Sequence, residues 1–191
     1  MDKVFLWTRQ DEKILKILDE KGVFQSKKQF VMEKYGDLFP LFEGIYSWLI
    51  FESNKIVKKP EGAEYPIWCS VSDEMMLRET EGTIILKLSI DRDKVVFFDS
   101  VRWDYAMNNM YVPENQADDK RFREKLKSRG LDPDYPVLDD NIFRFYPDIK
   151  RDILMSRNRI FDIKDSPYDR LQANIWEIRP EDISEIKYFR E

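Results

Sequence analysis

Residues 83–90 carry the strongest strand signal in the chain, and they limit the folds that it can adopt. Four aliphatic residues, Ile84, Leu86, Leu88 and Ile90, share one face of this segment. A short charged turn separates the segment from a second apolar run at residues 95–98. Strands this close in sequence are typical of neighbouring antiparallel strands, so we expect these two to lie side by side in a sheet.

The other expected elements are strands interleaved with helices of uneven length. We expect strands at residues 4–7, 65–71, 173–178 and 185–189, and helices around residues 14–18, 45–52, 73–78, 103–110, 114–130 and 149–160. Strict alternation of strand and helix would indicate a doubly wound parallel sheet, and this order does not alternate strictly. The sequence therefore predicts a single α+β domain over residues 1–191, with a mixed or mainly antiparallel central sheet and flanking helices.

The chain of 191 residues contains no histidine and one cysteine, Cys69. The absence of histidine excludes a Ser-His-Asp triad, a Cys-His dyad and a histidine-ligated metal within the chain. A single cysteine excludes an internal disulfide and a cysteine-rich zinc site, and we expect no metal. Acid–base chemistry would therefore depend on carboxylates, lysine, tyrosine or water.

The net charge is −5, from 37 acidic and 32 basic residues. A sequence-independent nucleic-acid binder needs a surplus of lysine and arginine, so the composition gives no strong nucleic-acid signal. No apolar run approaches the roughly 18–20 residues that cross a membrane. We expect a cytoplasmic chain with no membrane partner. The sequence leaves open whether the chain binds a protein partner.

Four segments resemble a bacterial family of domains of unknown function. They are Leu6-Trp7-Thr8, the stretch from Pro60-Glu61-Gly62 to Tyr65-Pro66-Ile67-Trp68, Arg159-Ile160-Phe161-Asp162, and Gln172-Ala173-Asn174-Ile175-Trp176-Glu177. The segments span nearly the whole chain. The resemblance implies a bacterial or phage origin and names no reaction.

A weaker similarity links the chain to the ADP-ribosyltransferase superfamily. In that fold an early strand ends in a polar residue that contacts NAD, a middle strand carries small hydroxyl residues, and a late strand carries a catalytic glutamate. Here the strand at residues 4–7 leads to Arg9, Ser70 and Ser72 end a middle strand, and Gln172 and Asn174 open a late strand. The resemblance implies that Arg9, Ser70 and Ser72 bind NAD, and that Gln172 and Asn174 orient its ribose as the catalytic pair.

The departure from this pattern is Asn174, which stands where the superfamily has its glutamate. Cleavage of the nicotinamide–ribose bond develops positive charge on the sugar, and a carboxylate stabilises that charge whereas an amide does not. Glu177 is close in sequence, but strand alternation places it on the opposite face from Gln172 and Asn174. Whether the chain is an enzyme is therefore left open by the sequence.

Two functions compete with a nucleotide-binding role. The first is a non-catalytic protein-interaction or scaffold protein, which the missing histidines and the missing glutamate favour. The second is a nuclease, because Glu185-Ile186-Lys187 has the E-x-K spacing of a large nuclease superfamily. Such tripeptides arise by chance in a chain with 36% charged residues, and no upstream metal-binding acid is convincingly placed.

Overall fold

The protein is described by a computed structural model that covers residues 2–133 and 144–189. The chain divides into two compact units, which are described separately. Unit 1 comprises Met1–Phe97 and Leu171–Glu191, and unit 2 comprises Phe98–Arg170. This division into compact units does not test whether residues 1–191 form a single domain, which stays a prediction.

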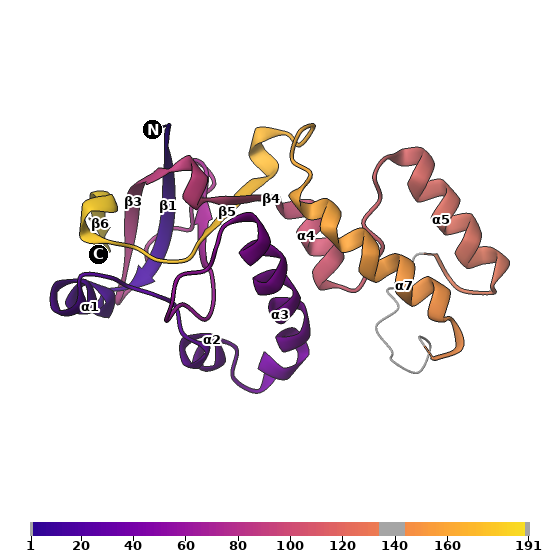
Figure 1. Cartoon of the computed structure of the whole chain (residues 1–191), viewed down its shortest axis with the longest axis horizontal. Coiled ribbons are helices and arrows are strands. Elements are labelled where there is room, and N and C mark those ends of the chain that lie inside the picture. Colours follow the sequence, from indigo (N-terminus) through magenta and orange to yellow (C-terminus); the bar gives the residue numbers. More distant parts are fainter. Residues whose placement is uncertain (1, 134–143, 190–191) are drawn as a thin grey trace. The chain divides into compact units, whose positions relative to one another are not determined.

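A six-stranded sheet is the framework of the fold (Figure 1). Its strands are β1 (Lys3–Asp11), β2 (Ile67–Ser70), β3 (Thr83–Asp91), β4 (Val96–Asp99), β5 (Leu171–Ile175) and β6 (Ile183–Tyr188). Their order is β4-β5-β2-β1-β3-β6, and β1 pairs with β2 and β3, β2 with β5, and β3 with β6, all antiparallel. The predicted α+β class with a mainly antiparallel sheet is confirmed.

The prediction that residues 83–90 and 95–98 are neighbouring strands is wrong. β3 has β1 on one side and β6 on the other, while β4 lies at the opposite edge of the sheet beside β5. A 3-10 turn at Arg92–Lys94, closed by a hydrogen bond from the Val95 N–H to the Arg92 carbonyl, redirects the chain between them. A short connection favours a hairpin only when one edge of the first strand is free to pair. Both edges of β3 are occupied, by β1 and by β6, so β4 cannot pair with it.

One face of the sheet forms the main core of unit 1. Leu6, Ile67, Leu86 and Ile175 come from four different strands and all belong to one buried cluster. Helix α1 (Lys13–Lys21) adds Ile14 and Leu18 to the same cluster and ends at Gly22, which has a positive φ of 68°. The predicted first helix and its glycine cap are confirmed, because local spacing alone specifies both.

The opposite face of the sheet is covered in part by α3 (Phe39–Ile56). Tyr46 of α3 lies edge-on to Trp68 of β2, with ring centroids 6.2 Å apart. Just after this helix, the Val57 carbonyl accepts a hydrogen bond of 2.9 Å from the Trp176 indole. Before it, α2 (Lys28–Tyr35) occupies a stretch in which the sequence predicts no helix or strand, since its apolar residues form no stripe.

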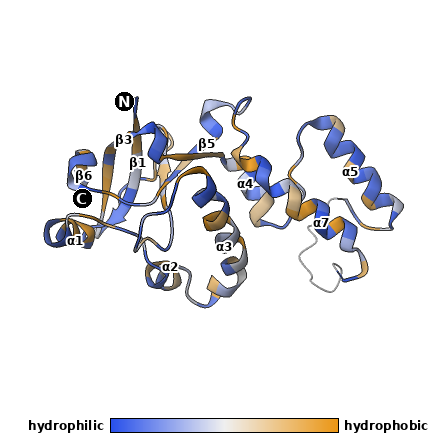
Figure 2. Cartoon of the chain, viewed as in Figure 1, coloured by the Kyte–Doolittle hydropathy of each residue, from blue (hydrophilic) through white to orange (hydrophobic). Residues whose placement is uncertain are grey.

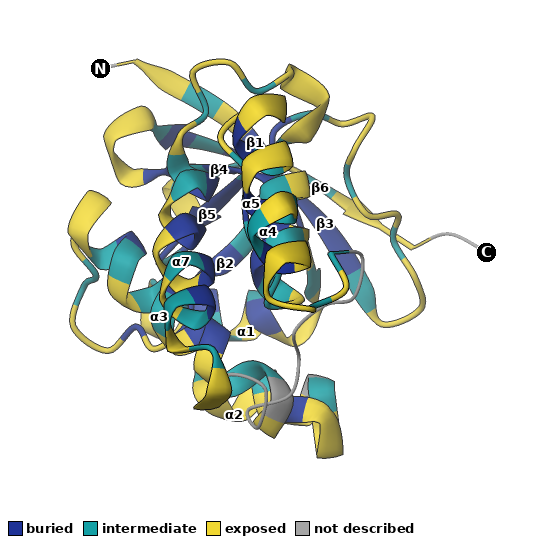
Figure 3. Cartoon of the chain, turned by 90° about the vertical axis from the view of Figure 1, so that its right-hand side faces the viewer, coloured by how far each residue is buried: buried dark blue, intermediate teal, exposed yellow. Residues whose placement is uncertain are grey.

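Unit 2 is helical in its described part, with α4 (Ser100–Met107), α5 (Gln116–Ser128), α7 (Pro147–Ser156) and a 3-10 helix at Arg157–Phe161. Its core joins Phe122 and Leu126 of α5 to Ile149 and Ile153 of α7. The rest of α5, a helix expected around residues 114–130, is largely hydrophilic and exposed (Figures 2 and 3).

One further sequence prediction is wrong, and one segment without a predicted element falls partly outside the described residues. Residues 73–78 form bends and turns instead of the expected helix, and the segment lies beside β1 and β2 through side-chain hydrogen bonds to its carbonyls. No helix or strand is expected at residues 131–148, and this segment lies in part outside the described residues.

Candidate functional site

The strand register aligns five side chains in one row across the sheet. Trp7 is the partner of Ser70 on β2 and of Lys87 on β3. Ser70 is in turn the partner of Gln172 on β5, and Lys87 is the partner of Glu185 on β6. Paired residues project to the same face, so Gln172, Ser70, Trp7, Lys87 and Glu185 form a continuous cross-sheet row on the face opposite the main core.

The cross-sheet row is partly exposed to solvent. Glu185 is exposed and the other four side chains are half-buried. The Lys87 ammonium lies 5.5 Å from the Trp7 ring centroid and 5.0 Å from that of Phe5, which is 54% exposed. Two aromatic rings and a cation therefore share the open part of this face.

Arg9 and Ser70 both hold the segment that follows β2. Arg9 comes two residues after Trp7 on β1 and therefore lies on the same face as the row. Its Nη1 donates a hydrogen bond of 3.1 Å to the Arg78 carbonyl, and the Ser70 hydroxyl donates one of 3.1 Å to the Met75 carbonyl. Each side chain keeps hydrogen-bonding capacity, since a guanidinium has five donors and a hydroxyl has two acceptor lone pairs.

Ser72 lies outside the cross-sheet row. It follows the end of β2 in a bend and is half-buried. The structure thus brings together three of the predicted positions, Arg9, Ser70 and Gln172, from three neighbouring strands, and leaves Ser72 apart from them.

Asn174 shares the face of Gln172 but is not accessible. It is the partner of Trp68 in the β2–β5 pair and is only 1% exposed. Among the described residues, neither its amide nitrogen nor its amide oxygen has a hydrogen-bond partner. The two amides predicted as a pair therefore differ, because Gln172 can meet solvent and Asn174 is enclosed.

Glu177 is engaged in contacts of its own. Its carboxylate accepts hydrogen bonds from Gln25 Nε2 at 3.0 Å and from Arg179 Nε at 2.9 Å. These bonds tie the segment after β5 to the residues that follow α1. The Glu177 carboxylate is therefore engaged within the fold, and Glu177 is not a member of the cross-sheet row.

Trp7, Lys87 and Glu185 are members of the row that the sequence analysis did not assign to the nucleotide site. Alternation along each strand could have placed Trp7 with Arg9, and Lys87 on the face opposite the core. Nothing in the local sequence predicts that β3 lies next to β1 in the sheet, or that β6 lies next to β3. The row is therefore visible only once the strand order is known.

A second polar cluster lies inside unit 2 around Asp118, which is 4% exposed. Its carboxylate accepts hydrogen bonds from the Tyr111 hydroxyl at 2.9 and 3.0 Å, from the Glu114 N–H at 3.0 Å and from Arg159 at 2.8 Å, and it also pairs with Arg121. Burial by itself raises the pKa of Asp118, but these donors and cations outweigh it and lower that pKa. Its bonds are saturated from within the fold, so this cluster is structural.

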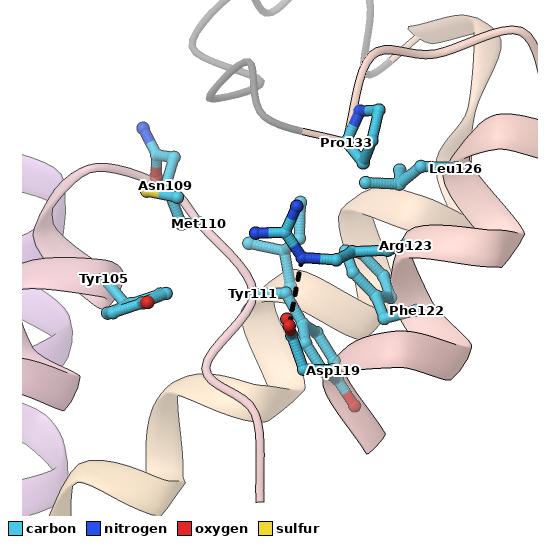
Figure 4. Close-up of a pocket in the computed structure, with 10 residues that line it drawn as sticks. Tyr105, Asn109, Met110, Tyr111, Asp119, Phe122, Arg123, Leu126 and Pro133 are labelled. Atoms are coloured by element: carbon cyan, nitrogen blue, oxygen red, sulfur yellow. Dashed lines mark hydrogen bonds and ion pairs between the residues drawn. The ribbon is translucent and has the colours of Figure 1, made fainter. Parts of the chain in front are cut away.

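Figure 4 shows a pocket of about 410 Å³, including space open to solvent, in unit 2. An ion pair of 3.0 Å between Arg123 and Asp119, both on α5, lies along one wall of this pocket. Its lining consists of Tyr105, Asn109, Met110, Tyr111, Asp119, Phe122, Arg123, Leu126, Pro133 and Ile153. None of the residues predicted for NAD binding lines this pocket, so it is not part of the candidate site.

Three further findings concern the described part of the chain. No group of three or more His, Cys, Asp or Glu side chains in residues 2–133 and 144–189 is placed to hold a metal ion. No helix in these ranges is both long and apolar enough to cross a membrane. Cys69 is buried, and this burial raises the pKa of its thiol to about 12, although a hydrogen bond with Thr8 acts in the opposite direction.

The segments that carry the family resemblance each have a defined place. Trp7 joins the cross-sheet row, and Arg159 binds the buried Asp118. In the loop before β2, Gly62 has a φ of 86° and its carbonyl accepts a hydrogen bond from Lys27. Trp176 binds the Val57 carbonyl after α3. The resemblance thus rests on residues that hold the fold together as well as on two members of the row, Trp7 and Gln172.

Comparison with known proteins identifies a family and no individual relative. Neither the curated proteins nor the solved structures give a match to this chain. The model of one family, described as Domain of unknown function (DUF3841), matches residues 5–184, which is nearly the whole chain. The protein therefore belongs to the DUF3841 family, as its four characteristic segments indicated.

Proposed function

We propose that the protein binds NAD or a closely related nucleotide at the cross-sheet row, in a site that resembles that of the ADP-ribosyltransferases. The single observation that carries the proposal is the register of β1, β2 and β5. Residues that the resemblance assigns to three separate segments lie on neighbouring strands, with Ser70 directly between Trp7 and Gln172.

The chemistry of the row suits the parts of a dinucleotide. Trp7 and Phe5 offer aromatic faces on which a base or nicotinamide ring stacks. Arg9 and Lys87 supply positive charge for the diphosphate, and Arg9 can present a planar fork to phosphate oxygens. Ser70 and Gln172 supply neutral hydrogen-bonding groups for ribose hydroxyls. At about 4.8 Å between strands, the row from Gln172 to Glu185 extends over roughly 19 Å, enough for an extended dinucleotide.

The proposal is for binding rather than for transfer of ADP-ribose. A transferase needs a carboxylate near the ribose to stabilise the developing cation. Asn174 supplies no charge and is enclosed, Glu177 is bound to Gln25 and Arg179, and Glu185 lies at the far end of the row from Gln172. We therefore propose a degenerate site in which nucleotide binding is retained without efficient turnover.

Calorimetric titration with NAD tests this proposal. We expect the wild type to bind, Arg9→Ala to weaken binding tenfold or more, and Gln172→Ala to weaken it about fivefold, because a charged hydrogen bond contributes about 1.5–3 kcal/mol and a neutral one about 1 kcal/mol. Matched controls are Arg151→Ala in α7 and Gln29→Ala in α2, both exposed and outside the row.

Either of two results would reject the site. If the wild type gives no heat with NAD at millimolar concentration, the competing interaction-protein function is favoured, and pull-down of partners becomes the next experiment. If the wild type binds but Arg9→Ala and Gln172→Ala bind as tightly as the two controls, the nucleotide lies elsewhere on the protein.

A further inference from the structure

β6 forms one edge of the sheet. It pairs with β3 along one side and is the last strand in the order β4-β5-β2-β1-β3-β6. No described residue outside β3 forms a backbone ladder with it. Its outer N–H and C=O groups are therefore available to another strand.

The centre of β6 carries two opposite charges on one face. Glu185 and Lys187 are both exposed, and they flank Ile186, whose half-buried side chain packs against the core of unit 1. Neither Glu185 nor Lys187 forms an ion pair with any other residue in the described part of the chain. These two residues are the ends of the E-x-K tripeptide of the sequence, although the register also places Lys87 of β3 opposite Glu185.

We propose that β6 is a self-association surface that pairs, antiparallel, with β6 of a second copy of this chain. The two-fold axis passes through Ile186, so that Ile186 of one copy faces Ile186 of the other. Glu185 of each copy then lies opposite Lys187 of its partner, which forms two cross-strand ion pairs. The result is a continuous sheet with six strands from each copy.

Charge complementarity selects this register. If the two-fold axis is moved by one residue toward the N-terminus, Glu185 faces Glu185, and if it is moved by one residue toward the C-terminus, Lys187 faces Lys187. Both shifts place like charges directly opposite each other, which destabilises a strand pair. Only the pairing centred on Ile186 satisfies both charges.

The same charges argue for a second copy over an unrelated strand. Charged residues on an edge strand protect it from pairing, because a strand without matching charges leaves them unpaired. A second copy supplies the matching lysine and glutamate by symmetry, at the right spacing. One six-residue strand covers much less than the roughly 800 Å² per partner of a standard interface, so we expect a weak, concentration-dependent dimer.

Sedimentation velocity over a range of protein concentrations tests the inference with four chains. We expect the wild type to shift toward dimer as the concentration rises. E185K and K187E each place like charges opposite each other in every copy, so each variant alone is expected to be monomeric. An equimolar mixture of E185K and K187E restores both ion pairs and is expected to dimerise, as is the double variant E185K/K187E.

Two control variants test whether an effect on dimerisation comes from the position of the charge on β6 or from the net charge of the protein. E81K and K164E make the same changes of charge at exposed residues in turns outside β6, and should leave the wild-type dimer intact. A wild type that stays monomeric at the highest concentration overturns the inference. So does dimerisation of E185K alone, or a mixture of E185K and K187E that stays monomeric. Because the readout is mass and not ligand binding, the result is independent of the proposed nucleotide site.

Discussion

Asn174 lies opposite Trp68 in the antiparallel pair of β2 and β5, enclosed to 1% exposure with both amide atoms unpartnered among the described residues. A buried polar group without a hydrogen bond costs about 1–3 kcal/mol of the free energy of unfolding. The amide of Asn174, which the sequence analysis assigned to a catalytic pair, thus destabilises the fold where it lies.

Replacement of this amide by leucine should therefore stabilise the protein. Leucine has a similar size and no polar atoms, so Asn174→Leu is expected to raise the free energy of unfolding by about 1 kcal/mol. Urea denaturation measures the change. In Gln172→Leu, where the amide is half-buried and meets solvent, we expect no such gain. A clear loss of stability in Asn174→Leu would show that the amide has a stabilising partner.

The buried carboxylate of Asp118 should make stability depend on pH. Its folded-state pKa is lowered below the unfolded value of about 3.9, so its contacts stabilise the fold above about pH 4 and this contribution disappears as the pH falls through the folded-state pKa. We expect Asp118→Asn to be less stable by about 3 kcal/mol at pH 7, with a difference that narrows toward pH 2. Thermal melts of both proteins from pH 7 to pH 2 measure this.

The neighbouring Asp119 provides the control for that experiment. Its carboxylate pairs with Arg123 at 3.0 Å but is 38% exposed, and pairs of this kind contribute about 0–1 kcal/mol. Asp119→Asn should therefore behave almost as the wild type does at every pH. Parallel pH profiles for the wild type and Asp118→Asn would contradict the role given to Asp118.

Gly62 in the loop before β2 should not tolerate a side chain. Its φ is 86°, and a Cβ atom there would lie 2.7 Å from Gln25 Oε1. Gln25 cannot easily move away, because its Nε2 donates to the Glu61 carbonyl and to Glu177. We expect Gly62→Ala to lower the free energy of unfolding by about 1–2 kcal/mol from backbone strain, and by more from the contact.

A second glycine makes that test specific. Gly44 lies inside α3, and a Cβ atom added there would meet no neighbouring atom within 4 Å. Gly44→Ala should therefore be neutral or stabilising by up to about 1 kcal/mol through helix propensity. Equal urea midpoints for the Gly62 and Gly44 variants would contradict the strain at Gly62.

Cys69 should be unreactive in the folded protein. Burial raises the pKa of its thiol to about 12, so almost no thiolate exists at about pH 8 and no reagent reaches the sulfur. We expect no labelling by a thiol-specific reagent under native conditions and one equivalent after denaturation. Ser128→Cys, at an exposed helix end, should label at once and serves as the positive control.

Local pattern determined much of the architecture. The α1 helix with Gly22, the alternating core face of β3 and the α+β class all follow from spacing along a few consecutive residues. The absence of histidine likewise excluded whole classes of chemistry without any structure. These predictions succeed because a helix or a strand buries its apolar side with a fixed period, whatever lies beyond it.

Only the tertiary structure decided which strands are neighbours. The sequence suggested β3 beside β4, and it could not show that Trp7 stands between Ser70 and Lys87, that Asp118 is buried, or that Asn174 is enclosed while Gln172 is not. Alternation fixes the face of each residue within its own strand. Register and strand order depend on contacts between segments far apart in the chain, where a shift of one residue moves every side chain to the opposite face.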